Sequence, residues 1–187
     1  MNTEKFKKYA AKWQRAGGGQ CPRCLSLHID KAPPAETHPR LLDIGAGNDK
    51  HMKEFKEKGY RVEGIDIGAQ GIKEMDMHEL DFPDATFDII FMSQVFEHAI
   101  APILALHEFN RVLRMKGVVF MNVPADCKQW VNADEHNFCV PRENYEALFR
   151  KCGFVPTFFQ EDKEAINGGD EQRMWTFMFV KVRDEGI

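Results

Sequence analysis

The chain has 187 residues, 43% of them hydrophobic and 29% charged, which is typical of one compact globular domain and excludes a disordered chain. Its net charge of −4 gives no overall attraction for nucleic acid, so a nucleic-acid partner is disfavoured. No apolar run approaches the roughly 20 residues that cross a bilayer, and the lysine-rich start lacks the apolar core of a signal peptide, so we expect a cytoplasmic protein without membrane contact.

The first 39 residues differ in pattern from the rest and are predicted to form a separate N-terminal segment. Phe6, Tyr9 and Trp13 have helical spacing and predict an amphipathic helix over residues 3–15. Its aromatic side chains would pack on the core, or its lysines would bind a polyanionic partner. A loop follows from Gly17 to Pro39, and we expect this segment to serve as a lid over a pocket.

Two cysteines in this segment raise the question of a zinc site. Cys21-x-x-Cys24 and His28 supply ligand types that zinc prefers, but a structural site needs four ligands, usually as two pairs. His136 and Cys139 are the only second pair to consider, and nothing in the sequence brings them to the first. The five cysteines are odd in number and scattered, which favours reduced thiols, and we predict no metal site.

Residues 40–187 alternate between short apolar runs and amphipathic stretches, which predicts a mostly parallel sheet with right-handed helical crossovers. One helix begins near Met52 and ends at Gly59. A second begins at Pro102, buries a stripe that includes Ile103 and Leu113, and ends at Gly117. A third begins at Pro141. Strands are predicted at residues 40–44, 60–67, 87–92, 118–123, 155–160 and 174–182.

The first predicted strand runs directly into the turn Gly45-Ala46-Gly47. Such a turn is shared by many nucleotide-binding proteins and is also compatible with a simple structural role. Asp66 lies 21 residues beyond Gly45, where a carboxylate can accept hydrogen bonds from both ribose hydroxyls of an adenosine. Asp43 and Asp49 flank the turn and would repel a diphosphate but attract a sulfonium and an ammonium, which favours S-adenosylmethionine over a dinucleotide.

Longer segments carry a resemblance to a known family. LLDIGAG, EGIDI, MDMHELDFPDATFDIIFMSQVFEH and LHEFNRVLRMKGVVFMNVP together resemble the class I S-adenosylmethionine-dependent methyltransferases, in particular the type 11 methyltransferase domains. The resemblance covers about residues 40–155. It implies a Rossmann-like doubly wound α/β fold in which helices cover both faces of the sheet and the last strand is antiparallel.

The resemblance also implies roles for individual residues. The glycine turn would hold the methionine end of S-adenosyl-L-methionine, and the end of the second strand would hold its ribose. The loop that follows the second strand would bind the adenine. The end of the strand at residues 87–92 would lie near the sulfonium. The product would be S-adenosyl-L-homocysteine. In chain order, the residues that would bind the cofactor are Asp43, Gly45, Ala46, Gly47, Asp66, Ile67, Asp76, Met77, Ser93 and Gln94.

The chain departs from the family pattern at two places. Asp49 replaces the third glycine of the usual turn, so the backbone path there is predicted to differ. The segment between Asp66 and Asp76 is too short for the helix usually found between those strands, which leaves the adenine edge more open. A subset of the family shows the same shortening together with upstream C-P-x-C and L-S-L-H elements, and residues 21–28 match those elements.

His98 and His136 are the candidate catalytic residues. Each follows a predicted strand at the same edge of the sheet, and an imidazole titrates near neutral pH, which suits a general base; a purely structural role is the alternative. The residues after the strand predicted at 87–92, Ser93-Gln94-Val95-Phe96, lack the N/D-P-P-Y/F motif of enzymes that methylate base amines, and no Pro-Cys lies nearby. We therefore expect an oxygen, carbon or small-molecule nitrogen acceptor.

The sequence supports an active methyltransferase with an unidentified acceptor. A catalytically inactive binding module with the same fold is the main alternative, motivated by Asp49 and the short crossover. A nicotinamide-dependent oxidoreductase is disfavoured by the acids around the turn. Little chain remains for a domain that covers the substrate, so residues 1–39, a large acceptor or a homodimer would complete the site.

Overall fold

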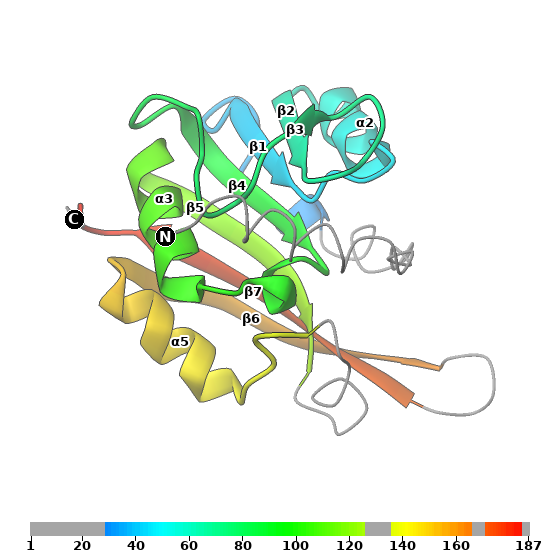
Figure 1. Ribbon diagram of the computed structural model, residues 1–187, viewed down its shortest axis with the longest axis vertical. Helices are drawn as coiled ribbons and strands as arrows, with labels where there is room; N and C mark the ends of the chain where they lie inside the picture. The colour runs from blue at the N-terminus through cyan, green and yellow to red at the C-terminus, as the bar shows by residue number, and fades with distance from the viewer. Residues whose placement is uncertain (1–28, 126–135, 166–170, 185–187) are drawn as a thin grey trace.

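The computed structural model describes residues 29–125, 136–165 and 171–184, which form a single twisted sheet with helices on both faces (Figure 1). The sheet has seven strands in the order β3-β2-β1-β4-β5-β7-β6. In chain order the elements are η1 (Ile29–Lys31), β1 (Arg40–Ile44), α2 (Lys50–Glu57), β2 (Arg61–Asp66), β3 (Lys73–Glu74), β4 (Phe87–Ser93), η2 (Phe96–His98), α3 (Pro102–Val112), β5 (Leu113–Pro124), α5 (Arg142–Lys151), β6 (Phe154–Ala165) and β7 (Glu171–Lys181).

Alternate residues of each central strand pack on opposite faces of the sheet, because side chains along a strand point to opposite sides. In β4, Ile90 packs against α3 and α5 in the larger apolar cluster. Its neighbours Ile89 and Phe91 pack with Phe55 of α2 in the smaller cluster on the other face. Central strands are thus covered on both sides, which explains the nearly continuous apolar run of β4.

The end of the sheet formed by β7 reverses direction. β7 pairs antiparallel with β5, from Val118 opposite Val180 to Pro124 opposite Met174, and antiparallel with β6 on its other side. Strands β1, β2, β3, β4 and β5 are mutually parallel. The predicted α/β fold with an antiparallel last strand is therefore confirmed.

The prediction for the helix after β4 was wrong at its C-terminal end. Helix α3 ends at Val112, and Leu113 already begins β5, where it pairs with Phe87. A Cβ on Gly117 would lie 2.9 Å from the Arg114 carbonyl oxygen, so this glycine serves an irregular stretch of the strand and not a helix end. The predicted apolar stripe was also partly wrong, since Ile103 is 55% exposed.

The connection between β2 and β3 contains no helix, as the short segment predicted. Residues 67–72 form a loop that leads directly to the two-residue strand β3 at the edge of the sheet. The two strands at the other end are longer than predicted and extend beyond residues 155–160 and 174–182 at several of their ends.

Residues 29–38 lie against the α2 side of the sheet. Ile29 and Ala32 belong to the smaller apolar cluster, the Tyr60 hydroxyl donates to the Pro33 carbonyl at 2.5 Å, and Lys58 bonds Asp30 at 2.7 Å. The helix predicted over residues 3–15 and the Cys21, Cys24 and His28 group lie outside the described residues. Within the described part of the chain, no helix is long and apolar enough to span a membrane.

Candidate functional site

The predicted site residues follow strands β1, β2 and β4, whose carboxyl ends lie at one edge of the sheet because the strands are parallel. The glycine turn leaves β1 here, with φ of 74° at Gly45 and 51° at Gly47, a backbone region that favours glycine. The amides of Gly45 and Ala46 both donate to the Ile65 carbonyl, at 2.8 and 3.0 Å. The turn is therefore fixed to the end of β2.

Gly45 is required by packing as well as by its backbone angle. A Cβ built on it would lie 2.2 Å from Cγ2 of Val95, which precedes η2. The segment that follows β4 thus lies directly over the glycine turn. This contact joins the part of the site built on β1 to the part built on β4.

Asp49 keeps the backbone conformation that a glycine would adopt at this position. Its φ is 63° and its ψ is 5°, in the left-handed region, and it forms the N-cap of α2 without a side-chain capping bond. Its carboxylate instead bonds the Lys53 ammonium at 2.8 Å on the outer side of the helix. The substitution therefore changes the side chain and leaves the left-handed turn in place.

Asp43 is the most unusual ionisable residue of the site. It is fully buried at the end of β1, and neither carboxylate oxygen has a hydrogen-bond partner among the described residues. Burial, and then the nearby Asp66 carboxylate, raise the pKa of Asp43 well above its ordinary value. A buried acceptor without a donor fits a ligand that brings a cationic N–H group.

Asp66 connects the glycine turn to the loop after β2. One carboxylate oxygen accepts from the Gly47 amide at 3.2 Å, and the other accepts from the amides of Gly68 and Ala69 at 3.0 and 3.1 Å. Ile67 lies partly exposed beside it. A carboxylate offers about four acceptor positions, so a ribose hydroxyl would share Asp66 with these amides or displace one of them.

The predicted adenine-binding segment is tied to the start of α3. Asp76 accepts from the backbone and ring nitrogens of His78, at 2.9 and 2.6 Å, and the other ring nitrogen of His78 lies 3.3 Å from the Ala101 amide. Met77 is buried in the larger apolar cluster. The segment is thus held by side chains that the sequence analysis did not consider.

Ser93 ends β4, where it pairs with Asn122 of β5, and Gln94 follows it. The Gln94 side chain donates to Asn122 at 2.7 Å, and Asn122 in turn donates to Thr176 of β7 at 3.0 Å. Gln94 has a φ of 59°, which is uncommon for a residue with a side chain. This conformation is held by a hydrogen bond from the Gln94 backbone amide to the Asn122 carbonyl at 2.9 Å. These hydrogen bonds join the residue after β4 to β5 and β7.

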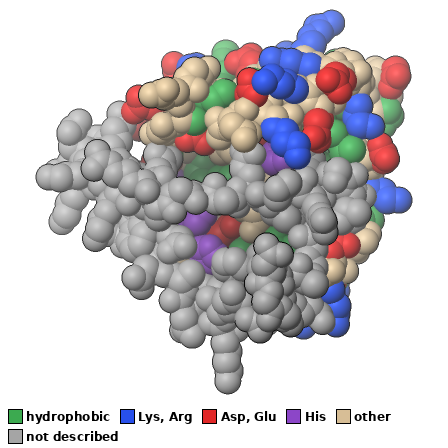
Figure 2. Space-filling model, turned by 90° about the vertical axis from the view of Figure 1, so that its right-hand side faces the viewer, with side chains coloured by type: hydrophobic (Ala, Val, Ile, Leu, Met, Phe, Trp, Pro, Cys, Tyr) green, Lys and Arg blue, Asp and Glu red, His purple; other side chains and the backbone are tan. Residues whose placement is uncertain are grey.

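The structure brings the two candidate catalytic residues together. The rings of His98 and His136 meet edge to face with centroids 5.2 Å apart, and histidine side chains are visible on the face shown in Figure 2. Two hydrogen bonds fasten their segments: the Phe138 amide to the Glu97 carbonyl at 2.8 Å, and the Asn137 side chain to the His98 carbonyl at 3.1 Å.

Glu97 is the third residue of this group. Its side chain is buried, and one carboxylate oxygen has no hydrogen-bond partner among the described residues. Burial raises the pKa of Glu97 to about 8. Ligand atoms of Glu97, His98 and His136 all lie within 4.8 Å of one another. Cys139, considered in the sequence as a partner of His136, is not in this group; its sulfur lies 3.8 Å from the Ala125 carbonyl oxygen.

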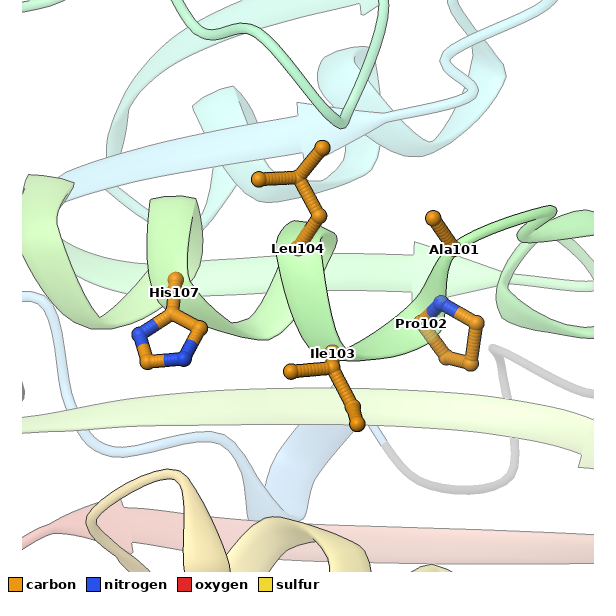
Figure 3. A pocket seen from close by; sticks show the side chains of 5 residues that line it. All are labelled: Ala101, Pro102, Ile103, Leu104 and His107. Carbon is orange, nitrogen blue, oxygen red and sulfur yellow. The ribbon is translucent and has the colours of Figure 1, made fainter. Parts of the chain in front are cut away.

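A separate apolar hollow of about 440 Å³ lies over the first turns of α3 (Figure 3). Its lining residues are Ala101, Pro102, Ile103, Leu104 and His107. None of them is a predicted site residue, so this hollow is distinct from the group around the glycine turn.

Sequence reasoning missed Asn122 and His78 and did not single out Glu97 as a site residue. Asn122 is the polar residue inside the apolar run of β5, and a polar side chain in a strand buried on both faces was a signal that could have been used. His78 and the burial of Glu97 had no comparable signal, because the contacts of His78 with Ala101 and of Glu97 with Phe138 join segments that are distant in sequence.

Comparison with known proteins agrees with this geometry. A family model described as a methyltransferase domain matches residues 19–157. A malonyl-[acyl-carrier protein] O-methyltransferase of Serratia marcescens is 29% identical in an alignment 123 residues long, and the match covers 54% of this chain and 48% of that protein. The aligned part of the chain therefore spans about half the length of this curated relative.

Solved structures share the fold. A 1,6-didemethyltoxoflavin-N1-methyltransferase of Burkholderia thailandensis, solved with S-adenosylhomocysteine, has a TM-score of 0.68 and 18% identity and covers 96% of this chain and 87% of its own. A Haloferax volcanii complex between the methyltransferase activator Trm112 and its partner gives a TM-score of 0.72 and 15% identity, covering 98% and 99%. A S-adenosylmethionine-dependent methyltransferase of Methanosarcina mazei gives 0.66 and 17%, covering 83% and 97%.

The fold, with its glycine turn and acids at the carboxyl edge of a parallel sheet, defines an α/β domain of the nucleotide-binding type. The chain belongs to the methyltransferase domain family. The family recognition and S-adenosylmethionine as the cofactor, both expected from the sequence, are confirmed. Nothing in these comparisons supports the inactive alternative.

Proposed function

We propose that this chain transfers a methyl group from S-adenosylmethionine to a protonated oxygen of a small-molecule acceptor. The observation that carries the proposal is the Asp43 carboxyl, buried without a hydrogen-bond donor beside the glycine turn and close enough to Asp66 to interact electrostatically. Two acids at the end of parallel strands suit a ligand that carries an ammonium and a ribose diol and no phosphate.

The residues around the turn divide the binding task among them. Asp43 would accept from the ammonium of the methionine part, with the backbone of residues 45–47 beside it. Asp66 would accept from the ribose, Ile67 would pack on the adenine, and Asp76 with the Met77 backbone would meet its amino edge. Ser93 and Gln94 would close the site next to the sulfonium. The bound cofactor supplies a methyl group that its sulfonium already activates.

His98 and His136 are the residues proposed to meet the acceptor. They lie at the same edge, and η2 is connected through Val95 to the glycine turn. An imidazole there can take the proton of a hydroxyl or carboxyl acceptor. The O-methyltransferase name of the Serratia marcescens relative supports an oxygen acceptor. The lack of a base-amine motif after β4 supports a small molecule over a nucleic-acid base.

Calorimetric titration with S-adenosylmethionine and S-adenosylhomocysteine tests the proposal. We expect micromolar binding by the wild type and binding at least about tenfold weaker by Asp66→Asn, because a hydrogen bond to a charged group contributes about 1.5–3 kcal/mol. Glu63→Gln, an exposed acid on the same strand, is the matched control and should bind like the wild type. Absence of binding to folded wild-type protein would refute the cofactor assignment.

The acceptor class is tested separately by the release of S-adenosylhomocysteine in the presence of small carboxylic acids, phenols, or nucleic acid. Stimulation by an oxygen acceptor, with a large loss of rate in His98→Gln, would support the proposal. Stimulation by nucleic acid alone would contradict the small-molecule acceptor and leave the cofactor assignment intact.

A further inference from the structure

We propose that Glu97, His98 and His136 bind a divalent transition-metal ion, with open coordination positions for an oxygen of the acceptor. This inference rests on the proposed function and goes beyond it, because methyl transfer does not by itself require a metal. It also departs from our expectation from the sequence that the chain holds no metal.

The first argument is the donor set and its geometry. Two imidazole nitrogens and one carboxylate oxygen lie within 4.8 Å of one another. Ligands about 2.0–2.1 Å from one zinc ion are roughly 3.3 Å apart in tetrahedral geometry, so small rotations of two side chains would close the group around an ion. Two histidines and one carboxylate with free positions are the ligands of many catalytic zinc and non-haem iron sites.

The second argument is the buried carboxylate. Glu97 is only 1% exposed, and one of its oxygens has no hydrogen-bond partner in the described part of the chain. A buried acidic group normally has a hydrogen bond or a cation. Its ligand oxygen lies within 4.8 Å of the ligand nitrogens of both imidazoles, so a cation bound by all three side chains would supply the missing partner.

The third argument is that the group is held in place by independent contacts. The backbone amide of Phe138 donates to the backbone carbonyl of Glu97 at 2.8 Å, and the rings of Phe138 and Phe96 have centroids 5.7 Å apart. Asn137 bonds the His98 carbonyl at 3.1 Å. These contacts fasten the residues directly after His136 to η2, which carries Glu97 and His98. Preorganised ligands of this kind are what a small cation site requires.

The consequence for function is a change in how the acceptor is activated. A hydroxyl or carboxyl oxygen bound to a divalent cation is more acidic than in water, because the cation stabilises the anion. An imidazole that ligates an ion cannot at the same time act as a free base. In the metal-bound protein, the two histidines would therefore hold the cation and orient the acceptor through it.

The test is a titration of metal-free protein with Co²⁺ and Zn²⁺, followed by visible absorption and calorimetry. We expect one Co²⁺ per chain with visible ligand-field bands and without the near-ultraviolet thiolate band of cysteine ligation. His98→Gln and His136→Gln should each weaken binding more than about tenfold, since even residues that only support metal ligands change affinity by 10–100-fold. His38→Gln, a histidine that precedes β1 at the opposite end of the sheet, is the matched control.

Several outcomes would overturn the proposal: no binding, binding unaffected by both histidine variants, or binding lost only in Cys21→Ser with Cys24→Ser. Glu97→Gln should also weaken binding, and the variants of the two partly exposed histidines keep the test valid if that buried substitution fails to fold. S-adenosylmethionine affinity is measured on the same metal-free samples. If the wild type binds S-adenosylmethionine but no metal, the metal site alone is refuted. If the folded wild type does not bind S-adenosylmethionine, the proposed function is refuted.

Discussion

Asp43→Asn should stabilise the cofactor-free protein at neutral pH while weakening cofactor binding. The Asp43 carboxyl is fully buried and lacks a hydrogen-bond donor among the described residues, and burial raises its pKa well above the ordinary value of 3.8. Folding therefore favours the protonated form of Asp43 relative to the unfolded chain. An amide has nearly the same shape and carries no charge at any pH, so the variant avoids this cost.

The sign and size follow from proton linkage. Because the folded pKa lies above the unfolded one, the stability contributed by the protonated carboxyl is complete below pH 3.8 and is lost as the pH rises toward the folded pKa. Across that range the wild type should lose about 1.4 kcal/mol of unfolding free energy per pH unit relative to Asp43→Asn. For a domain of this size, that is a difference of about 3–6 °C in Tm per pH unit.

Urea unfolding of both proteins without cofactor, at pH 5, 6 and 7, measures this difference. Groups that titrate identically in the two proteins cancel, and Asp81→Asn, an exposed acid, serves as the control with no expected trend. S-adenosylmethionine should raise the Tm of the wild type more than that of Asp43→Asn, because the ligand's ammonium would stabilise the Asp43 carboxylate in the complex, which the neutral amide cannot replace. A stability difference that stays constant from pH 5 to pH 7 would refute the reasoning.

Three further substitutions test the packing and electrostatics around the site. Gly45→Ala should lower the free energy of unfolding by about 1–3 kcal/mol more than Gly71→Ala does. Both glycines have positive φ, but only a Cβ at position 45 would meet Val95, at 2.2 Å. Equal losses in urea unfolding would contradict this. Arg111→Ala should lose about 1–3 kcal/mol, because its guanidinium holds two carbonyls of the loop before β4, and a Tm unchanged within 1 °C would argue against it. Burial lowers the pKa of His51 to about 4, so the stability contributed by the neutral imidazole is complete above pH 6.5 and is lost as the pH falls toward 4. His51→Leu should therefore flatten the acid side of the curve of unfolding free energy against pH. An unchanged slope would disprove the assignment.

The order of strands and helices was predictable because burial imposes a period on the sequence. The apolar run of residues 87–92 predicted a strand covered on both faces, and β4 occupies Phe87–Ser93 with its side chains alternating between the two apolar clusters. The end of α3 was not predictable in the same way. Leu113 continues the helical apolar pattern, but the opportunity to pair with Phe87 in the sheet places it in β5.

The glycine turn shows the same division at the level of the site. Two glycines after a strand predicted a turn at the end of β1, and in the structure Gly45 and Gly47 both have positive φ. The substitution at Asp49 suggested a different path, yet this residue keeps the left-handed conformation with its carboxylate bonded to Lys53. Helix geometry places residues i and i+4 together, so that ion pair could have been foreseen.

What the sequence determined by itself is local: which segments form strands and helices, where the glycine turn lies, and which acids stand at the ends of strands. What the tertiary structure decided is which distant residues meet and which of them are buried. The meeting of His98 with His136, the isolation of the Asp43 carboxyl and the burial of Glu97 all depend on the packing of segments far apart in the chain. Contacts and desolvation of this kind are properties of the folded assembly, and they set the charge and hydrogen bonding on which the chemistry depends.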